Sequence, residues 1–138
     1  MISKKFIFLE HTADVKFQAF GKDIEEAFSN SALALREVMT EKSKIKGKIK
    51  KKIIVKGKDK EKLLYNFLEE FLILFDSEGF VLSKIKKIKI KDEKLEAEVI
   101  GDNAKNYKFS NSVKAITYNQ MFVKQEKGKW IVQVVIDV

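Results

Sequence analysis

The sequence contains no cysteine, which excludes disulfide bonds, zinc–thiolate sites and thiol nucleophiles. It has a single histidine, His11, so a Cys–His pair is impossible and any Ser–His–Asp triad would depend on that residue. No glycine-rich phosphate loop follows a predicted strand, so both a Walker A motif and a dinucleotide fingerprint are missing. We therefore expect no independent nucleotide site and no independent nucleotide-using enzyme.

Proline is also absent, and no stretch rich in glycine or serine suggests a linker. The 138 residues are therefore expected to form one domain, residues 1–138. No apolar stretch approaches the roughly 18 residues needed to cross a bilayer, and the apolar run near the N-terminus is too short for a secretion signal. We expect a cytoplasmic protein that makes no membrane contact.

Arginine is nearly absent, since Arg36 is the only one among 28 basic residues, although the net charge is +8. Arginine makes the bidentate contacts that read phosphates and guanine edges, so its scarcity weakens the nucleic-acid hypothesis that the charge suggests. Lysine with isoleucine and glutamate also matches the composition of heat-adapted proteins. The lysine excess is therefore interpreted first as a hydrated surface, with a weak tRNA contact through the lysines as the alternative.

The sequence does show clear hydrophobic periodicity. Asp23 and Glu26 form a capping pair that predicts a helix over residues 24–40, and Asp59 begins a second helix, residues 60–76. The wide apolar face of the second helix favours a position in the core over a surface covered by a partner. Strands are predicted at residues 5–9, 15–20, 49–56, 80–91, 95–100, 113–118, 121–126 and 130–136. This order predicts an α+β fold with a mostly antiparallel sheet and two main helices.

Two polar places could carry chemistry. The first is the cluster Glu10-His11-Thr12-Ala13-Asp14 between the first two predicted strands, which taken alone favours an ordinary polar turn. The second is the end of the chain, where Asp137 and the α-carboxylate of Val138 are adjacent. If the last strand pairs near the start of the second strand, Asp14 joins them, and three carboxylates would require a cation. Oxygen ligands of this kind suit calcium, magnesium or manganese, whereas a solvated terminus is the simpler interpretation of this end alone.

Several ordered blocks of the sequence are similar to the signatures of the archease family. Together they span nearly the whole chain, in the family's order. The blocks are residues 9–17, residues 25–28 and 32–34 in the first helix, residues 63–70 in the second, residues 76–79, residues 113–118 and the closing residues 135–138.

The resemblance implies a specific function. Archeases are accessory proteins of the RtcB-type tRNA-splicing RNA ligase, which joins RNA ends through a guanylylated histidine. They promote that guanylylation and multiple turnover, can broaden nucleotide use, and bind a divalent cation, most often calcium. By position, the resemblance implies metal ligands at Asp14, Asp137 and Val138, with Glu10, His11 and Thr12 as possible support for the loop and no catalytic residue.

One residue departs from the family pattern. Where the family usually has histidine after Lys-Ala-x-Thr-Tyr, this chain has Asn119, which cannot shuttle a proton near neutral pH. Two alternatives stay open beside the resemblance. One is a general RNA-binding or chaperone-like module that uses the lysine-rich residues 42–62, and the other is an independent metal-dependent hydrolase that uses His11 and Asp14.

Overall fold

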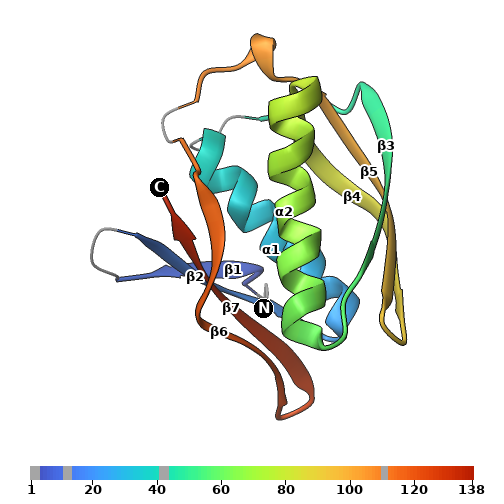
Figure 1. Ribbon diagram of the computed structural model, residues 1–138, viewed down its shortest axis with the longest axis vertical. Helices are drawn as coiled ribbons and strands as arrows, with labels where there is room; N and C mark the ends of the chain where they lie inside the picture. The colour runs from blue at the N-terminus through green and yellow to red at the C-terminus, as the bar shows by residue number, and fades with distance from the viewer. Residues whose placement is uncertain (1–3, 11–13, 41–43, 110–111) are drawn as a thin grey trace.

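The computed structural model describes residues 4–10, 14–40, 44–109 and 112–138. Within these ranges the chain forms seven strands and two long helices (Figure 1). They are β1 (Phe6–Leu9), β2 (Val15–Gly21), α1 (Ile24–Thr40), β3 (Ile49–Lys56), α2 (Lys60–Glu78), β4 (Phe80–Lys91), β5 (Lys94–Asn103), the short 3-10 helix η1 (Ala104–Asn106), β6 (Ala115–Glu126) and β7 (Lys129–Asp137).

The strands form two antiparallel sheets, one in the order β1-β2-β7-β6 and the other in the order β3-β5-β4. In Figure 1, α2 stands between β6 and β3, and α1 lies behind it. Helix α1 contacts β2 and β4, and α2 contacts β3 and β6, so each helix touches both sheets. The predicted α+β fold with mostly antiparallel strands and two main helices is confirmed.

Local signals in the sequence set the ends of both helices. Asp23 Oδ1 accepts a hydrogen bond from the Glu26 N–H at 2.8 Å, and Asp59 Oδ1 accepts one from the Lys62 N–H at 2.7 Å. These bonds satisfy N–H groups that have no partner within the helix. Helix α2 continues to Glu78, two residues beyond the predicted Asp76, because Gly79 provides its stop. Gly79 has φ 65° and donates its N–H to the carbonyls of Leu74 and Phe75.

Aromatic side chains from both helices form the centre of the core. The Phe28 and Phe67 rings stack at 6.2 Å between centroids, and the Phe67 and Phe71 rings meet edge to face at 5.1 Å. Phe28 and Phe67 are fully buried, while Ile73 on the outer side of α2 is 47% exposed. The apolar face of α2 therefore lies in the core, as its periodicity predicts.

One prediction about the strands is wrong. Residues 113–118 and 121–126 were expected to form two strands, but β6 runs continuously from Ala115 to Glu126 beside β7. The pairing register jumps between Thr117 and Phe122, and Gln120 has φ 55° within the irregular stretch. The polar residues that suggested a break therefore form a bulge, because the straight partner strand β7 holds β6 on both sides of it.

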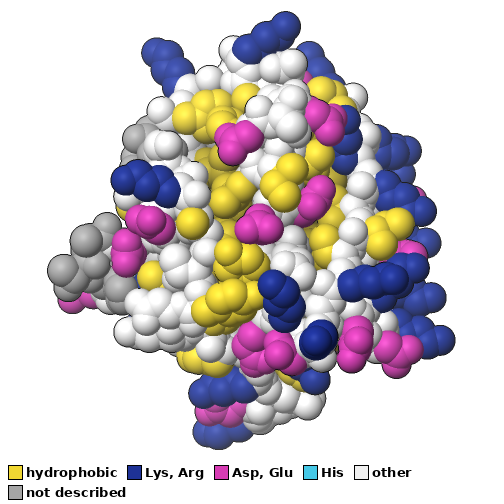
Figure 2. All heavy atoms as spheres, in the orientation of Figure 1, with side chains coloured by type: hydrophobic (Ala, Val, Ile, Leu, Met, Phe, Trp, Pro, Cys, Tyr) yellow, Lys and Arg dark blue, Asp and Glu magenta, His cyan; other side chains and the backbone are white. Residues whose placement is uncertain are grey.

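The sheet β3-β5-β4 has one apolar side and one charged side. Its apolar side includes Ile53 and Val99, which are buried against the helices. Eight lysines share the opposite, solvent-facing side, which we call the lysine face: Lys50, Lys52, Lys56, Lys84, Lys87, Lys89, Lys91 and Lys94. Figure 2 shows basic side chains along the right-hand edge of the molecule, where Figure 1 places β3 and β4.

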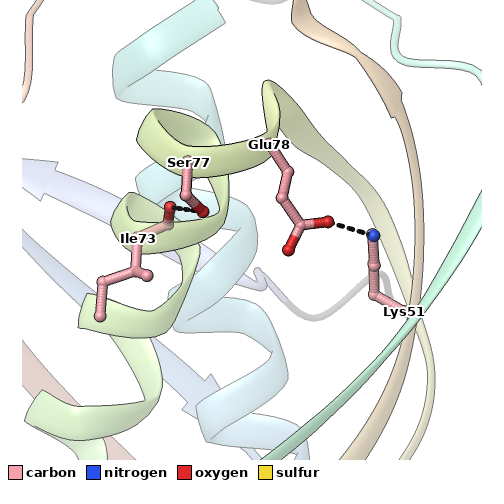
Figure 3. A network of polar contacts seen from close by, with 4 residues as sticks. All are labelled: Lys51, Ile73, Ser77 and Glu78. Atoms are coloured by element: carbon pink, nitrogen blue, oxygen red, sulfur yellow. Dashed lines mark hydrogen bonds and ion pairs between the residues drawn. The ribbon is translucent and has the colours of Figure 1, made fainter.

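Lys51 differs from its neighbours because it belongs to the apolar side of β3. Its Nζ forms an ion pair and hydrogen bond with Glu78 Oε1 at the end of α2 (Figure 3). The neighbouring Ser77 hydroxyl donates to the carbonyl of Ile73, one turn earlier in α2, at 2.7 Å. The end of α2 is therefore linked to the edge of this sheet by a polar contact as well as by core packing.

Candidate functional site

The central strand β7 brings the predicted metal ligands together. Val15 at the start of β2 pairs with Ile136 near the end of β7. One step beyond this pair, the next residues on the two strands are Asp14 and Asp137. Side chains at directly opposite positions of an antiparallel pair lie on the same face, with Cβ atoms about 4.5–5.5 Å apart. The register therefore satisfies the condition on which the cation site depended.

Strand β6 fixes the same end of β7 from the other side. Ala115 pairs with Asp137, and the Lys114 N–H donates to the Asp137 carbonyl at 2.8 Å. Asp14, Asp137 and Val138 are all half-buried. Pairing with β6 therefore holds the Asp137 backbone at this end of β7.

The chemistry of this donor set suits a hard divalent cation. Within the described ranges, no cluster of three or more His, Cys, Asp or Glu side chains is placed to hold a metal ion. Asp14 precedes Val15 and Asp137 follows Ile136, so continuing the β2–β7 register by one step brings the two aspartates opposite each other, with Val138 as the next residue. Calcium, magnesium and manganese bind carboxylate and carbonyl oxygens. The residues therefore fit such a cation, and nitrogen and sulfur ligands are not required.

The predicted supporting residues are only partly described. Glu10 follows β1 and is exposed, whereas His11 and Thr12 lie outside the described residues. Their role as support for the loop stays a prediction.

The bulge in β6 creates a feature that sequence patterns did not reveal. The rings of Tyr65 on α2 and Tyr118 in the bulge stack at 4.3 Å with an interplanar angle of 9°, and Tyr118 is 49% exposed. Lys62 Nζ lies 5.4 Å and 5.8 Å from the two ring centroids. Burial and then the nearby Glu69 carboxylate raise the pKa of Tyr65. The only local signal was the pair Asn119-Gln120, which interrupts the alternation of the strand.

The bulge also contacts β2, the strand that follows Asp14. Gln120 Oε1 accepts a hydrogen bond from Lys16 Nζ at 2.9 Å, and the Gln120 carbonyl accepts one from Gln133 Nε2 at 2.8 Å. Asn119, at the position where the family usually has histidine, is exposed. Asp14 and Asp137, which we call the aspartate pair, therefore lie beyond one end of the β2–β7 pairing, and the bulge lies on the same sheet opposite the middle of β7.

A second polar cluster lies on the other sheet. Asp102, which is 4% exposed, accepts hydrogen bonds from the Tyr107 hydroxyl at 2.6 Å and from the Asn103 N–H at 2.8 Å. The Tyr107 hydrogen bond is the main reason that the pKa of Asp102 lies below its usual value. The Tyr107 hydroxyl in turn accepts from the Lys46 N–H at 2.9 Å. This network joins the segment before β3 to the end of β5, which is a structural role.

Comparison with known proteins identifies the family. The model of the Archease protein family matches residues 6–138. The chain belongs to the archease family. Among archease relatives, the Methanosarcina barkeri protein is 38% identical over 141 residues, covering 98% of this chain and 97% of the relative. The Pyrococcus furiosus protein is 42% identical over 135 residues, covering 94% and 95%.

Solved structures agree with the archease assignment. The solution structure of Methanobacterium thermoautotrophicum protein 1598 has a TM-score of 0.82 and 35% identity, covering 97% of this chain and 99% of that one. The Thermotoga maritima archease, described as a possible chaperone, has a TM-score of 0.60 at 20% identity and therefore supports the fold alone. In the described part of this chain, no helix has the length and apolar character to span a membrane.

Proposed function

We propose that this archease-family chain is a non-catalytic activator of an RtcB-type tRNA-splicing RNA ligase in the cytoplasm. It promotes guanylylation of the ligase and multiple turnover, and it broadens the ligase's use of nucleotides. The observation that carries this proposal is the β2–β7 register: Val15 pairs with Ile136, and the next residues along the two strands are Asp14 and Asp137, followed by Val138. That arrangement supports a divalent-cation site at the sheet end where the family signature lies.

The residues of this end have distinct tasks in the proposal. Asp14 and Asp137 hold the cation with side-chain oxygens, and Val138 adds a further oxygen ligand. A bound divalent cation, most simply calcium with magnesium or manganese as alternatives, supplies positive charge that can attract nucleotide phosphates at the mouth of the ligase active site. The hydrogen bond from Lys114 and the pairing of β6 with β7 keep the ligands in place.

A ligase guanylylation time course tests this proposal. The ligase is incubated with GTP and defined divalent metals, without RNA, in the presence or absence of this protein. Asp14→Ala and Asp137→Ala are expected to abolish the acceleration because each removes one of two neighbouring carboxylates. Asp76→Ala is the matched control, since Asp76 is an exposed aspartate near the end of α2.

Thermal melting of each variant checks that the fold is intact. Wild-type rates with either Asp14→Ala or Asp137→Ala would show that the aspartate pair is not the activating site. Failure of the wild-type protein to accelerate guanylylation in any divalent metal would overturn activation itself.

A further inference from the structure

The charge on the lysine face is arranged in rows across three strands. In one row Lys56 on β3, Lys94 on β5 and Lys91 on β4 occupy opposite positions. Two rows away on the same face, Glu98 on β5 lies between Lys52 on β3 and Lys87 on β4. Glu96 and Glu98 are the acidic residues of this face, against eight lysines. The face therefore has a large excess of positive charge, arranged in a regular array of side chains.

Simple solvation does not account for this arrangement. Like charges at directly opposite cross-strand positions destabilise a sheet, so the all-lysine row has a cost in the isolated protein. Lysines on the edge strands β3 and β4 also discourage pairing of sheet edges between molecules. That explanation does not extend to Lys94, which lies on the central strand β5. Lys94 forms an ion pair with Glu96 Oε1 at 3.1 Å, and a polyanionic partner would offset the repulsion among the three lysines of the row.

The spacing of the lysines suits a phosphate backbone. Alternate residues along a strand are roughly 6.5–7 Å apart, and neighbouring strands are roughly 4.8 Å apart. The lysines of β4 begin at Lys84 and end at Lys91, a span of roughly 24 Å at the usual rise per residue. Exposed Ile54 lies on the same face, next to Glu96. Several ammonium groups of this array can therefore contact consecutive phosphates.

The chemistry of the face favours backbone contact over base recognition. All its basic groups are lysines, which bind phosphate as point charges, and the chain's one arginine, Arg36, donates to the Ser83 carbonyl from α1. The large exposed aromatic side chains among the described residues, Phe8 and Tyr118, belong to the other sheet. The face therefore has no aromatic platform on which unpaired bases could stack.

We infer that the lysine face binds the phosphate backbone of base-paired RNA without reading its sequence. The face lies on the sheet β3-β5-β4, whereas the aspartate pair lies on the sheet β1-β2-β7-β6, so RNA and cation have separate sites. The choice of RNA over DNA rests on the proposed function. The pKa of Glu96 agrees with this geometry, because it is lowered first by a hydrogen bond from Lys94 and also by Lys52 and Lys89.

The surface differs from the lysine-rich segment 42–62 that the sequence suggested. Lys50, Lys52 and Lys56 of that segment belong to the lysine face, but Lys51 points to the helix side and pairs with Glu78. Five of the eight lysines come from β4 and β5 instead. The pairing of strands, and not one run of lysines, builds the surface.

Titration of a fluorescent RNA duplex of about 16 base pairs, monitored by anisotropy at two salt concentrations, tests the inference. With about five phosphate contacts, wild-type affinity is expected to fall on the order of 500-fold between roughly 50 and 200 mM salt. The variant Lys56→Gln, Lys89→Gln, Lys91→Gln is expected to bind more weakly and to lower the salt slope by about three. The matched control Lys22→Gln, Lys105→Gln, Lys108→Gln removes the same charge from exposed positions elsewhere and keeps the wild-type slope.

Three results would overturn the inference. Equal loss of affinity in both triple variants would mean that only net charge matters. Equal wild-type affinity for a single strand of the same length would exclude recognition of the duplex. Equal affinity for poly-glutamate of the same charge would indicate an acidic protein as the partner. The binding assay contains no ligase and the guanylylation assay contains no RNA, so each proposal can fail without the other.

Discussion

The four-stranded sheet has two aspartates next to one end of β7, whereas the three-stranded sheet has eight lysines distributed over all three strands of its outer face. Asp14 and Asp137 come from opposite ends of the chain, and each lies one residue beyond the Val15–Ile136 pair of the β2–β7 register. The lysines of β4 alternate with isoleucines along a single strand. The difference shows that the net charge of +8 is not spread evenly: the outer face of the three-stranded sheet has eight lysines and two glutamates, whereas two aspartates lie next to one end of the pairing between β2 and β7.

The two charged regions depend on one shared core. Phe67 on α2 stacks with Phe28 on α1 and meets Phe71, and both helices contact both sheets. The largest expected effect is therefore that of Phe67→Ala, which should lower the free energy of unfolding by about 3–5 kcal/mol. Denaturant unfolding should show one transition for both sheets.

Ile73→Ala on the exposed side of the same helix is the control, with an expected change within about 0.5 kcal/mol. Two separate transitions in the Phe67→Ala protein would mean that the sheets unfold independently and that the core is not shared.

A smaller effect is expected for the polar network of the three-stranded sheet. The pKa of Asp102 is lowered in the folded state, so its contribution to stability is complete above its unfolded pKa, about 3.9. This contribution disappears as the pH falls through the lower, folded pKa. Tyr107→Phe removes the main hydrogen bond, so the pKa of Asp102 should rise and acid unfolding should begin at a higher pH.

The pKa of Asp102 can be followed by NMR, and acid unfolding by circular dichroism. Tyr118→Phe is the control because Tyr118 stacks on Tyr65 at the surface of the other sheet. An unchanged pKa of Asp102 in the Tyr107→Phe protein would show that the network does not stabilise the carboxylate.

These regions also differ in what the sequence could predict. The helix caps at Asp23 and Asp59 and the alternation in β4 are local, so both helices, the strands other than β6 and the α+β class followed from the sequence. The approach of the Asp14 segment to the Asp137 segment depends on pairing between distant strands, so residue patterns left it conditional, and the archease resemblance supplied the expectation. The β6 bulge and its Tyr65–Tyr118 stack depend on β7 as a template, which local alternation does not show.

The smallest effect tests the lysine face without any partner. Lys56 and Lys91 lie on either side of Lys94, so replacing both with glutamine should relieve repulsion and raise the free energy of unfolding by a few tenths of a kcal/mol. Lys52 and Lys87 lie on either side of Glu98. Replacing both of these lysines with glutamine removes attraction and should lower the free energy of unfolding by a similar amount. Both double variants lose the same charge, and urea unfolding at low salt compares them directly. Both changes in the free energy of unfolding should become negligible at high salt, where exposed charges are screened. The same sign in both variants would mean that total charge, and not its arrangement in rows, governs the stability of this sheet.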